Sequence, residues 1–259
     1  MLESLAPAAA IGFVAGYLSG QFGIGGGIIT APAIRMLLGG SALVSIGTPL
    51  PVIIPTSLTG VVAYARRGLL DVRTGVAIGV AGAAFSTLGA WATSFVGGEI
   101  ALAMMAALIV WTAADMLHLA LRSAPEAHAT AMREERRRSW FWLVGIGAVT
   151  GAASGFLGLG GGFVMVPALV RFLGFDAKRA VGTSLVAVMV LAVPGTITHW
   201  ALGHIDWTIA FGLILGVVPG AALGARVTAA AQERTIRVAF AVMLLGVGGL
   251  LAANELGWL

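Results

Sequence analysis

Two serines, each followed by a run of glycines, are the residues of this sequence best suited to bind a ligand. Ser19 opens the stretch SGQFGIGGGIITAP, and Ser154 opens SGFLGLGGGFVMVP 135 residues later. Glycine permits backbone dihedrals that other residues avoid, so each run predicts a break in a helix. A helix that restarts after such a break presents unpaired N–H groups and the positive end of its dipole, which together attract anions. The two stretches therefore predict two anion-binding helix ends, each with a serine hydroxyl about two turns before the restart.

The candidate substrate-binding residues are the two serines, the glycines at the restarts and the polar residues that accompany them. The full set is Ser19, Gln21, Gly25, Gly26, Gly27, Thr48, Ser154, Gly160, Gly161, Gly162, Thr183 and Ser184. Irregular backbone at membrane depth is tolerated only inside protein or along a cavity, so the breaks predict a cavity between them. Two alternatives stay open. Small residues often serve only close helix packing, and a serine or threonine can bond back to its own helix.

The elements that must position these residues are membrane helices. The chain has 259 residues, of which 59% are apolar and 10% charged, and its mean hydropathy is +0.99. Its apolar runs are continuous rather than alternating, which is typical of membrane helices and not of a lipid-facing barrel. The runs cover residues 4–38, 42–65, 74–97, 100–121, 140–173, 180–202, 207–229 and 236–256. We therefore predict an all-α integral membrane protein.

Composition also excludes several classes of site and partner. The chain contains no cysteine, so it has neither disulfides nor thiolate metal sites, and we expect no cofactor and no metal. The pI of about 10.6 reflects arginines at the ends of apolar runs, as membrane topology requires, so nucleic acid is not an expected partner. The first run carries Glu3 and no Lys or Arg, and so lacks the positive region of a cleaved signal peptide. The cluster REERRRSW, residues 133–140, predicts a cytoplasmic loop beside anionic lipid.

The chain is a tandem duplication. Between 16–27 and 151–162, seven of twelve positions are identical without a gap, and the same offset pairs Pro32 with Pro167 and Asp71 with Asp206. We divide the chain into a first membrane repeat (1–121), a cytoplasmic linker (122–139) and a second membrane repeat (140–259).

The positions of the cations predict that the two halves are inverted. In the first half they follow the second apolar run, whereas in the second half the matching loop holds only His204 and Asp206 and the flanking loops are positive. Inversion requires each half to cross the membrane an odd number of times. One helix over 4–38 would be about 52 Å long, against a hydrocarbon core of about 30 Å. We therefore predict that 4–38 and 140–173 are re-entrant hairpins turning at the glycines, each followed by three transmembrane helices. The alternative is eight plain spans with both termini inside.

Two titratable groups are candidates for a gating or proton-linked step. His199 lies beside Trp200 near a membrane boundary, followed by His204, and imidazole titrates near neutral pH. Asp115 falls near the cytoplasmic end of the fourth run, with His118 one turn later. The alternatives are an aromatic belt at the interface for the first group and interfacial solvation for the second.

The paired Gly-Gly-Gly elements, together with GTSL at Gly182 to Leu185, resemble the TauE/SafE family of bacterial membrane proteins over essentially the whole chain. The resemblance implies a transporter for small sulfur-containing anions, such as sulfite, sulfoacetate or other organosulfonates, in the cytoplasmic membrane. The first half reads GTPL where the second reads GTSL, so the two half-sites are not chemically equal. The expected partners are the small anion and membrane lipid, with a homodimer left open.

We do not expect an enzyme. A serine in a glycine-rich membrane helix with a distant histidine is similar to the intramembrane serine proteases of the rhomboid type, but those carry Gly-x-Ser-Gly. Here two residues separate Gly16 from Ser19, and two separate Gly151 from Ser154. A duplicated serine also argues against a hydrolase, which needs one nucleophile paired with one base. A membrane scaffold that transports nothing is the other alternative.

Overall fold

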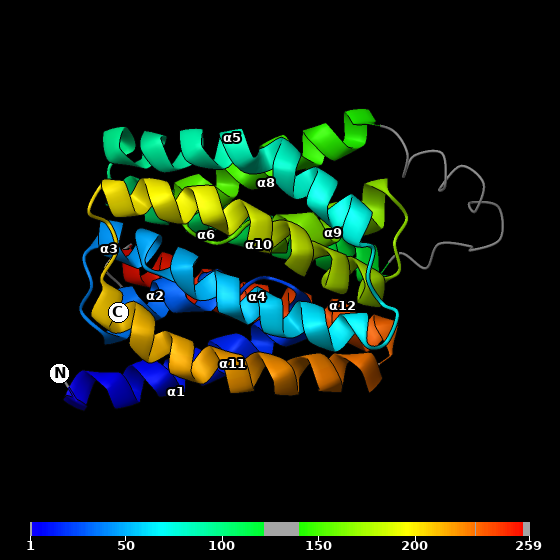
Figure 1. Cartoon of the computed structure of the whole chain (residues 1–259), viewed down its shortest axis with the longest axis horizontal. Helices are drawn as coiled ribbons and strands as arrows, with labels where there is room; N and C mark the ends of the chain where they lie inside the picture. Colours follow the sequence, from blue (N-terminus) through cyan, green and yellow to red (C-terminus); the bar gives the residue numbers. More distant parts are fainter. Residues whose placement is uncertain (1, 122–139, 231, 256–259) are drawn as a thin grey trace.

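The computed structural model describes residues 2–121, 140–230 and 232–255, and within these ranges it contains helices and no strand, as predicted. The helices in chain order are α1 (Leu2–Phe22), α2 (Gly27–Leu37), α3 (Ala42–Gly47), α4 (Pro49–Ala65), α5 (Val72–Val96), α6 (Gly98–Leu121), α8 (Trp140–Leu157), α9 (Gly162–Phe172), α10 (Ala177–Ala201), α11 (Trp207–Ala230) and α12 (Glu233–Glu255). The long helices lie side by side in one bundle (Figure 1). Among the described residues, seven stretches are long and apolar enough to cross a membrane, so the chain is a multi-pass membrane protein.

The glycine runs break the helices at the places that the sequence predicts. After the first run the helix restarts at Gly27, and after the second at Gly162. The residues just before these restarts, Gly26 and Gly161, have φ angles of +93° and +74°. This left-handed region is strained for any residue with a Cβ, so the restarts depend on glycine.

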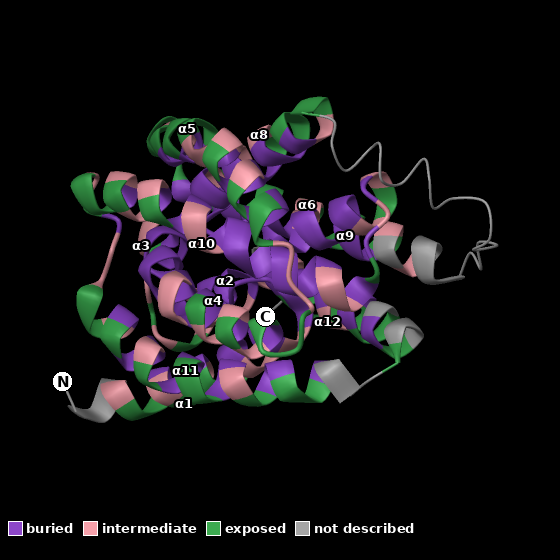
Figure 2. Cartoon of the chain, turned by 45° about the vertical axis from the view of Figure 1, so that its right-hand side comes forward, coloured by how far each residue is buried: buried purple, intermediate pink, exposed green. Residues whose placement is uncertain are grey.

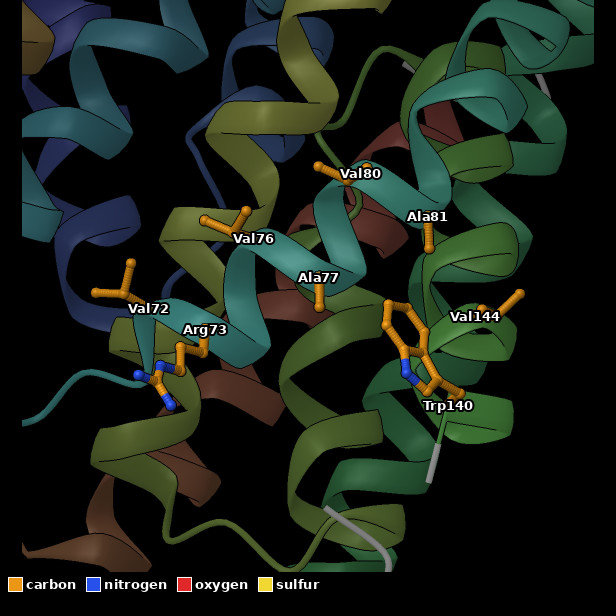
Figure 3. Close-up of a pocket in the computed structure, with 8 residues that line it drawn as sticks. All are labelled: Val72, Arg73, Val76, Ala77, Val80, Ala81, Trp140 and Val144. Atoms are coloured by element: carbon orange, nitrogen blue, oxygen red, sulfur yellow. The ribbon is translucent and has the colours of Figure 1, made fainter. Parts of the chain in front are cut away.

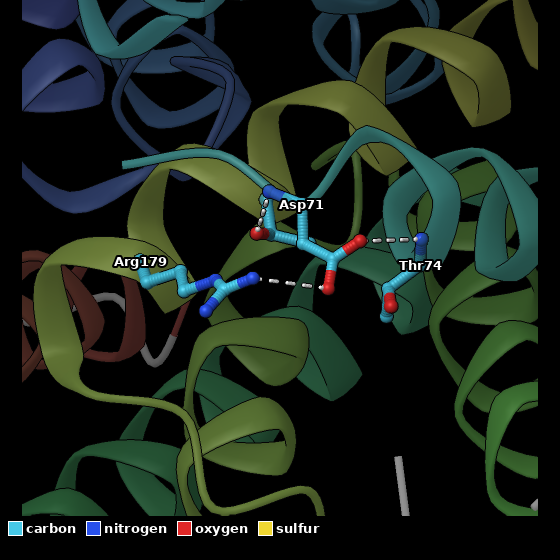
Figure 4. Close-up of polar contacts among 4 residues, drawn as sticks. Asp71, Thr74 and Arg179 are labelled. Atoms are coloured by element: carbon cyan, nitrogen blue, oxygen red, sulfur yellow. Dashed lines mark hydrogen bonds and ion pairs between the residues drawn. The ribbon is translucent and has the colours of Figure 1, made fainter. Parts of the chain in front are cut away.

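Two threonines connect the halves by an exchanged pair of hydrogen bonds. The hydroxyl of Thr183 accepts a hydrogen bond from the N–H of Asp71 at 3.1 Å, just before α5 (Figure 4). At the equivalent place in the other half, the hydroxyl of Thr48 accepts from the N–H of Asp206 at 3.0 Å, just before α11. The carboxylate of Asp71 also caps α5 by accepting from the N–H of Thr74. Each half thus holds the start of a long helix in the other.

The halves also exchange helices, because α1 packs against α11 of the second half and α8 packs against α5 of the first. In both pairs every fourth residue of one helix is a glycine that meets the partner's backbone: Gly12, Gly16 and Gly20 face Leu213, Val217 and Ala221, and Gly147, Gly151 and Gly155 face Ile78, Gly82 and Ser86. A Cβ on Gly16 would lie 2.3 Å from the carbonyl oxygen of Val217. Both pairs are therefore parallel and in backbone contact, as small-residue stripes permit.

The two 11-residue helices that follow the glycine breaks, α2 and α9, end at opposite ends of α6. Arg35 in the last turn of α2 lies 3.7 Å from Glu99 in the first turn of α6. Arg171 in the last turn of α9 pairs instead with Asp115, far along the same helix. Glu99 and Asp115 are separated by about 24 Å of helix at 1.5 Å per residue. The two glycine-broken segments therefore lead toward opposite faces of the bundle.

Burial follows the arrangement expected for a protein surrounded by lipid. Buried residues gather in the middle of the bundle, and exposed residues lie along the outer faces of the long helices (Figure 2). Large apolar side chains such as Trp91, Phe95 and Phe141 stand on that outer surface. The two breaks lie in the interior, because all residues of 22–28 and 157–163 are buried.

Candidate functional site

The two breaks lie in direct contact at the centre of the bundle. A Cβ on Gly27, the first residue of α2, would lie 2.8 Å from the carbonyl oxygen of Gly158 in the other break. A Cβ on Gly162, the first residue of α9, would lie 2.4 Å from the carbonyl oxygen of Gly23. Each helix start is thus seated on the break of the opposite half, which brings the two positive helix ends close together.

Unpaired backbone donors are concentrated at these two starts. In α2 the first amides bonded within the helix are those of Ile29 and Thr30, which donate to the carbonyl of Gly26. In α9 the amides of Val164 and Met165 donate in the same way to Gly161. The preceding N–H groups have no acceptor within their own helix, and each helix end carries roughly half a positive charge.

The serines Ser19 and Ser154 are fully buried, and within the described part of the chain neither hydroxyl has a hydrogen-bond partner. The Cβ of Ser19 lies 3.8 Å from the position of a Cβ on Gly26, one residue before the α2 start. A buried, unsatisfied hydroxyl costs about 1–3 kcal/mol, so two at equivalent positions need an explanation. A ligand that accepts their hydrogen bonds supplies one.

The predicted cavity between the breaks is filled by two aliphatic side chains in this structure. A Cβ on Gly25 would lie 2.7 Å from Cγ1 of Val188, and a Cβ on Gly160 would lie 2.8 Å from Cδ1 of Ile53. Ile53 and Val188 are equivalent residues of α4 and α10, and both are fully buried. The breaks are closed in this structure in the sense that these side chains fill the space against the glycines and the helix starts are buried.

The two half-sites differ in the space that surrounds them. At Gly26 no atom would lie closer than 3.8 Å to an added Cβ, whereas at Gly161 the carbonyl oxygen of Thr150 would lie 2.5 Å from it. Within the described residues, the first half also has a buried hydroxyl without a hydrogen-bond partner at Ser57, one turn after Ile53 on α4, and the second half has one at Thr196 on α10. The sequence interpretation missed Ser57. No local sequence signal distinguishes it, because a single hydroxyl in a helix usually bonds back to the preceding turn.

Other predicted site residues use their polar groups in contacts within the protein. Thr48 and Thr183 accept the exchanged hydrogen bonds described above. The hydroxyl of Ser184 donates to the carbonyls of Gly23 and Val181, at 2.9 and 2.8 Å. The side-chain amide of Gln21 donates to the hydroxyl of Tyr17 on the same helix, at 3.3 Å. These contacts hold the helices around the breaks. Of the predicted polar site residues, Ser19 and Ser154 are the two whose side chains have no hydrogen-bond partner within the described structure.

His199 and His204 form a buried pair beside the second break. Nε2 of His199 lies 2.8 Å from the carbonyl oxygen of Gly155, and the two Nδ1 atoms are 3.0 Å apart. Because a carbonyl only accepts, Nε2 carries the hydrogen, so Nδ1 of His199 accepts and Nδ1 of His204 donates. The equivalent residue in the first half, Tyr64, donates its hydroxyl hydrogen to the carbonyl of Gly20 at 2.9 Å. His199 is thus bonded to the backbone and is not paired with a serine as a catalytic base.

Acid is expected to destabilise the protein through this histidine pair. Burial lowers the pKa of His204, in the α10–α11 connection, below its ordinary value of 6.5. The unfolded chain therefore binds the proton at His204 more readily, so stability is complete above about pH 6.5 and falls as the pH drops below it. Thermal unfolding between pH 7.5 and 5 measures this loss. The double variant His199→Tyr/His204→Leu, which copies Tyr64 and Leu69 of the first half, should flatten the curve. If the double variant loses as much stability in acid as the wild type, other titratable groups cause the loss.

Asp115, the other candidate for a proton-linked step, pairs with Arg171 at the end of α6. The arginine side chain is more than half exposed, so the pair contributes at most about 1 kcal/mol. The side chain of His118 lies outside the described residues. No group of three or more possible metal ligands among His, Asp and Glu gathers within the described ranges.

Comparison with known proteins places this architecture in a family of transporters. The sequence profile described as "Sulfite exporter TauE/SafE" matches residues 8–251. The probable membrane transporter protein YunE of Bacillus subtilis is 29% identical over 255 residues, covering 92% of this chain and 93% of its own. A probable membrane transporter protein of Xylella fastidiosa is 30% identical over 226 residues, covering 86% and 84%. The probable membrane transporter protein MJ0441 of Methanocaldococcus jannaschii is 23% identical over 255 residues, covering 93% and 92%.

No solved structure matches the chain significantly. The relatives are named as membrane transporters and not as enzymes. The family profile covers nearly the whole chain, including both glycine breaks, α6 and the histidine pair. The chain therefore belongs to the TauE/SafE sulfite exporter family of membrane transporters.

Proposed function

We propose that the protein is a secondary transporter that moves a small sulfur-containing anion, sulfite or an organosulfonate such as sulfoacetate, across the cytoplasmic membrane. The anion is held near mid-membrane by the N-terminal ends of α2 and α9 and by the hydroxyls of Ser19 and Ser154. The family to which the chain belongs supports transport and the sulfur-anion class.

The observation that carries the proposal is the pair of buried serine hydroxyls, one turn before each break, that have no hydrogen-bond partner among the described residues. A small oxyanion offers several acceptor atoms, which suits a site made of amides and hydroxyls. Ser19 lies beside the restart of α2, and the start of α9 is seated against the same region. The described residues around the breaks include no buried Lys or Arg, so the anion is held by dipoles and hydrogen bonds, which favours release as well as binding.

The same proposal includes two inverted repeats, each made of a glycine-broken re-entrant hairpin and three spans. It is supported by the ion pairs of Arg35 and Arg171 at opposite ends of α6 and by the reciprocal hydrogen bonds of Thr48 and Thr183. In Figure 1 α1 begins and α12 ends at the left, and α8 begins at the right. If the chain instead crossed the membrane eight times, the start of α1, the start of α8 and the end of α12 would all lie at one face.

The cations indicate which face is cytoplasmic. Arg67 donates to the carbonyl of Arg226 at 3.3 Å, and Arg179 pairs with Asp71, so the α4–α5, α9–α10 and α11–α12 connections share one positive face. Arg35 stands at the opposite face. We assign the positive face to the cytoplasm. Alkaline phosphatase fused after the C-terminus is expected to be active outside the cytoplasm, and an inactive phosphatase with a fluorescent cytoplasmic fusion would overturn this orientation.

The closed breaks and the membrane potential constrain the transport cycle. Because residues 22–28 and 157–163 are buried, the anion reaches the helix starts only after Ile53 and Val188 move away from the glycines. An inside-negative potential favours export of an anion by about 2.3 kcal/mol per charge per 100 mV. Uniport would therefore suffice for export, whereas uptake would need a coupled proton or cation.

The test is the thermal stability of the detergent-purified protein with sulfite, sulfoacetate, taurine, sulfate, phosphate and chloride. A ligand at 100 times its Kd stabilises the folded state by about 2.7 kcal/mol if it binds only that state. We expect sulfite or an organosulfonate to raise the unfolding temperature in a saturable way, and chloride to leave it unchanged. Equal shifts with all anions, or no shift with any, would contradict the assigned substrate class.

A further inference from the structure

An open groove between α5 and α8 lies on the outer surface of the bundle, away from the two breaks (Figure 3). It encloses about 760 Å³. Its walls are Val72, Val76 and Val80 of α5 and Trp140 and Val144 of α8, and the side chain of Arg73 stands at one end. The groove thus combines an apolar trough with one cation.

The groove exists because small residues of α5 face an aromatic side chain that lies at the start of α8. Ala77 and Ala81 project from α5 toward Trp140 (Figure 3). On the buried side of the groove the two helices are in contact, since a Cβ on Gly147 would lie 2.6 Å from the carbonyl oxygen of Ile78. This contact closes the inner side of the groove, whose lining valines and Trp140 are exposed on the outer surface of the bundle.

The surroundings of the groove are hydrocarbon along most of its length. Both helices are candidate membrane spans. The side chains of Val80 and Trp140 are 63% and 67% exposed, so no described part of the chain covers them. From Arg73 to Ala81 the groove follows about 12 Å of helix. A trough of this length and polarity suits an acyl chain.

The charged end of the groove lies at the membrane boundary. Gly147 is level with Ile78, so Trp140, two turns earlier on a parallel helix, is level with the start of α5 and with Arg73. Trp and Arg at one depth are typical of the headgroup region. This is the positive face, which also carries Arg67 and Arg226.

Arg73 has no acidic partner within the described residues. The nearest carboxylate in sequence, that of Asp71, pairs with Arg179 at 3.5 Å and caps Thr74 at 3.1 Å (Figure 4). Arg73 is therefore an exposed cation at the mouth of an apolar groove, and the complementary ligand has an anionic headgroup and an acyl chain.

We propose that this groove is a binding site for an anionic phospholipid, whose phosphate pairs with Arg73 and one of whose acyl chains lies along Val76, Val80 and Val144. The site is separate from the transport site and does not depend on which anion is transported. Its occupancy joins a helix of the first half to a helix of the second.

The test uses the full chain purified in detergent, with binding of phosphatidylglycerol and phosphatidylcholine of identical acyl chains measured by native mass spectrometry and thermal stability. We expect saturable binding with preference for phosphatidylglycerol, and no effect of sn-glycerol 3-phosphate, which has the charge without the chains. Arg73→Gln should weaken phosphatidylglycerol about five-fold and abolish the preference. Arg66→Gln, which removes an exposed arginine outside the groove, is the matched control.

A second variant tests the trough itself. Ala77→Leu/Ala81→Leu fills the groove and should weaken both lipids, whereas Ala84→Leu, exposed on α5 outside the groove, should weaken neither. Equal affinity for the two lipids in the wild type, or an equal loss in the Arg73 and Arg66 variants, would overturn the assignment. If the double leucine variant does not fold, the arginine pair decides alone.

Discussion

Replacing Ser19 or Ser154 with alanine is expected to weaken anion binding about 10- to 100-fold without lowering the stability of the unliganded protein. A hydrogen bond to a charged group contributes about 1.5–3 kcal/mol, which accounts for the loss of affinity. Neither hydroxyl has a protein partner within the described structure, so its removal breaks no bond of the closed state. The unliganded variants should unfold at the wild-type temperature or slightly above it, since a buried unsatisfied hydroxyl has been removed. Titration of the stabilising anion by thermal shift measures both quantities.

Ser184→Ala is the matched control for these two variants. Its hydroxyl is equally buried but donates to the carbonyls of Gly23 and Val181, so its loss should lower stability by about 1 kcal/mol. The alanine variants of Ser19 and Ser154 are thus expected to lose anion affinity and keep their stability, whereas the Ser184 variant is expected to lose stability. If Ser19→Ala and Ser154→Ala bind the anion with wild-type affinity, the hydroxyls are not part of the site and the glycines serve packing alone.

The second large effect is expected at the first residues of α2 and α9. Gly27→Ala and Gly162→Ala should each lower stability by about 1–3 kcal/mol and abolish transport, because the new methyl group would lie 2.8 or 2.4 Å from a carbonyl oxygen of the other break. Separating the breaks also separates the two helix ends that the anion needs. Unfolding temperature and anion flux in reconstituted vesicles measure the two consequences.

Gly145→Ala is the matched control, because it adds the same methyl group to a helix at a position where no neighbouring atom would contact it. Gly145 lies within α8, and no atom stands within 4 Å of a Cβ at that position. Alanine there should leave transport intact and stabilise the helix by about 0.5–1 kcal/mol. Full transport and normal stability in the Gly27 or Gly162 variant would show that contact between the breaks is not required. Leucine at Gly26 or Gly161, where φ is positive, should abolish binding altogether.

The sequence predicts those parts of the fold that depend on local chemistry. Continuous apolar runs of about 20 residues predict helices because the bilayer offers the backbone no other partner. The glycine runs predict where α2 and α9 begin, at Gly27 and Gly162, because only glycine takes the required dihedrals. The internal offset predicts which residues are equivalent, such as Thr48 and Thr183.

Equivalence, however, does not say which residues touch. Nothing local indicates that Gly16 faces Val217, because a glycine stripe is compatible with any helix that offers a smooth face. The role of Thr48 cannot be predicted from the sequence for a similar reason. A threonine in an apolar run can line a cavity, bond back to its own helix or form a hydrogen bond to another helix. In the structure it holds the N–H of Asp206, which is 158 residues away.

The filled space between the breaks is also a property of packing rather than of local sequence. Ile53 and Val188 are ordinary members of apolar runs, and only the fold places both against Gly25 and Gly160. The sequence does not distinguish Ser57, because a single hydroxyl in a helix usually bonds back to the preceding turn. Its missing partner becomes visible only when the surrounding atoms are known.

The exchange of helices between the halves has a consequence for biosynthesis. The glycine face of α1 packs against α11, and Gly12 and Leu213 are about 200 residues apart in the chain. At 5–20 residues per second, α1 waits roughly 10–40 s after its own synthesis before its partner emerges from the ribosome. During that interval its glycine stripe faces lipid or the insertion machinery. The first helix to be made is therefore among the last to be packed, and the nascent first half is the stage at which this protein is most exposed to quality control.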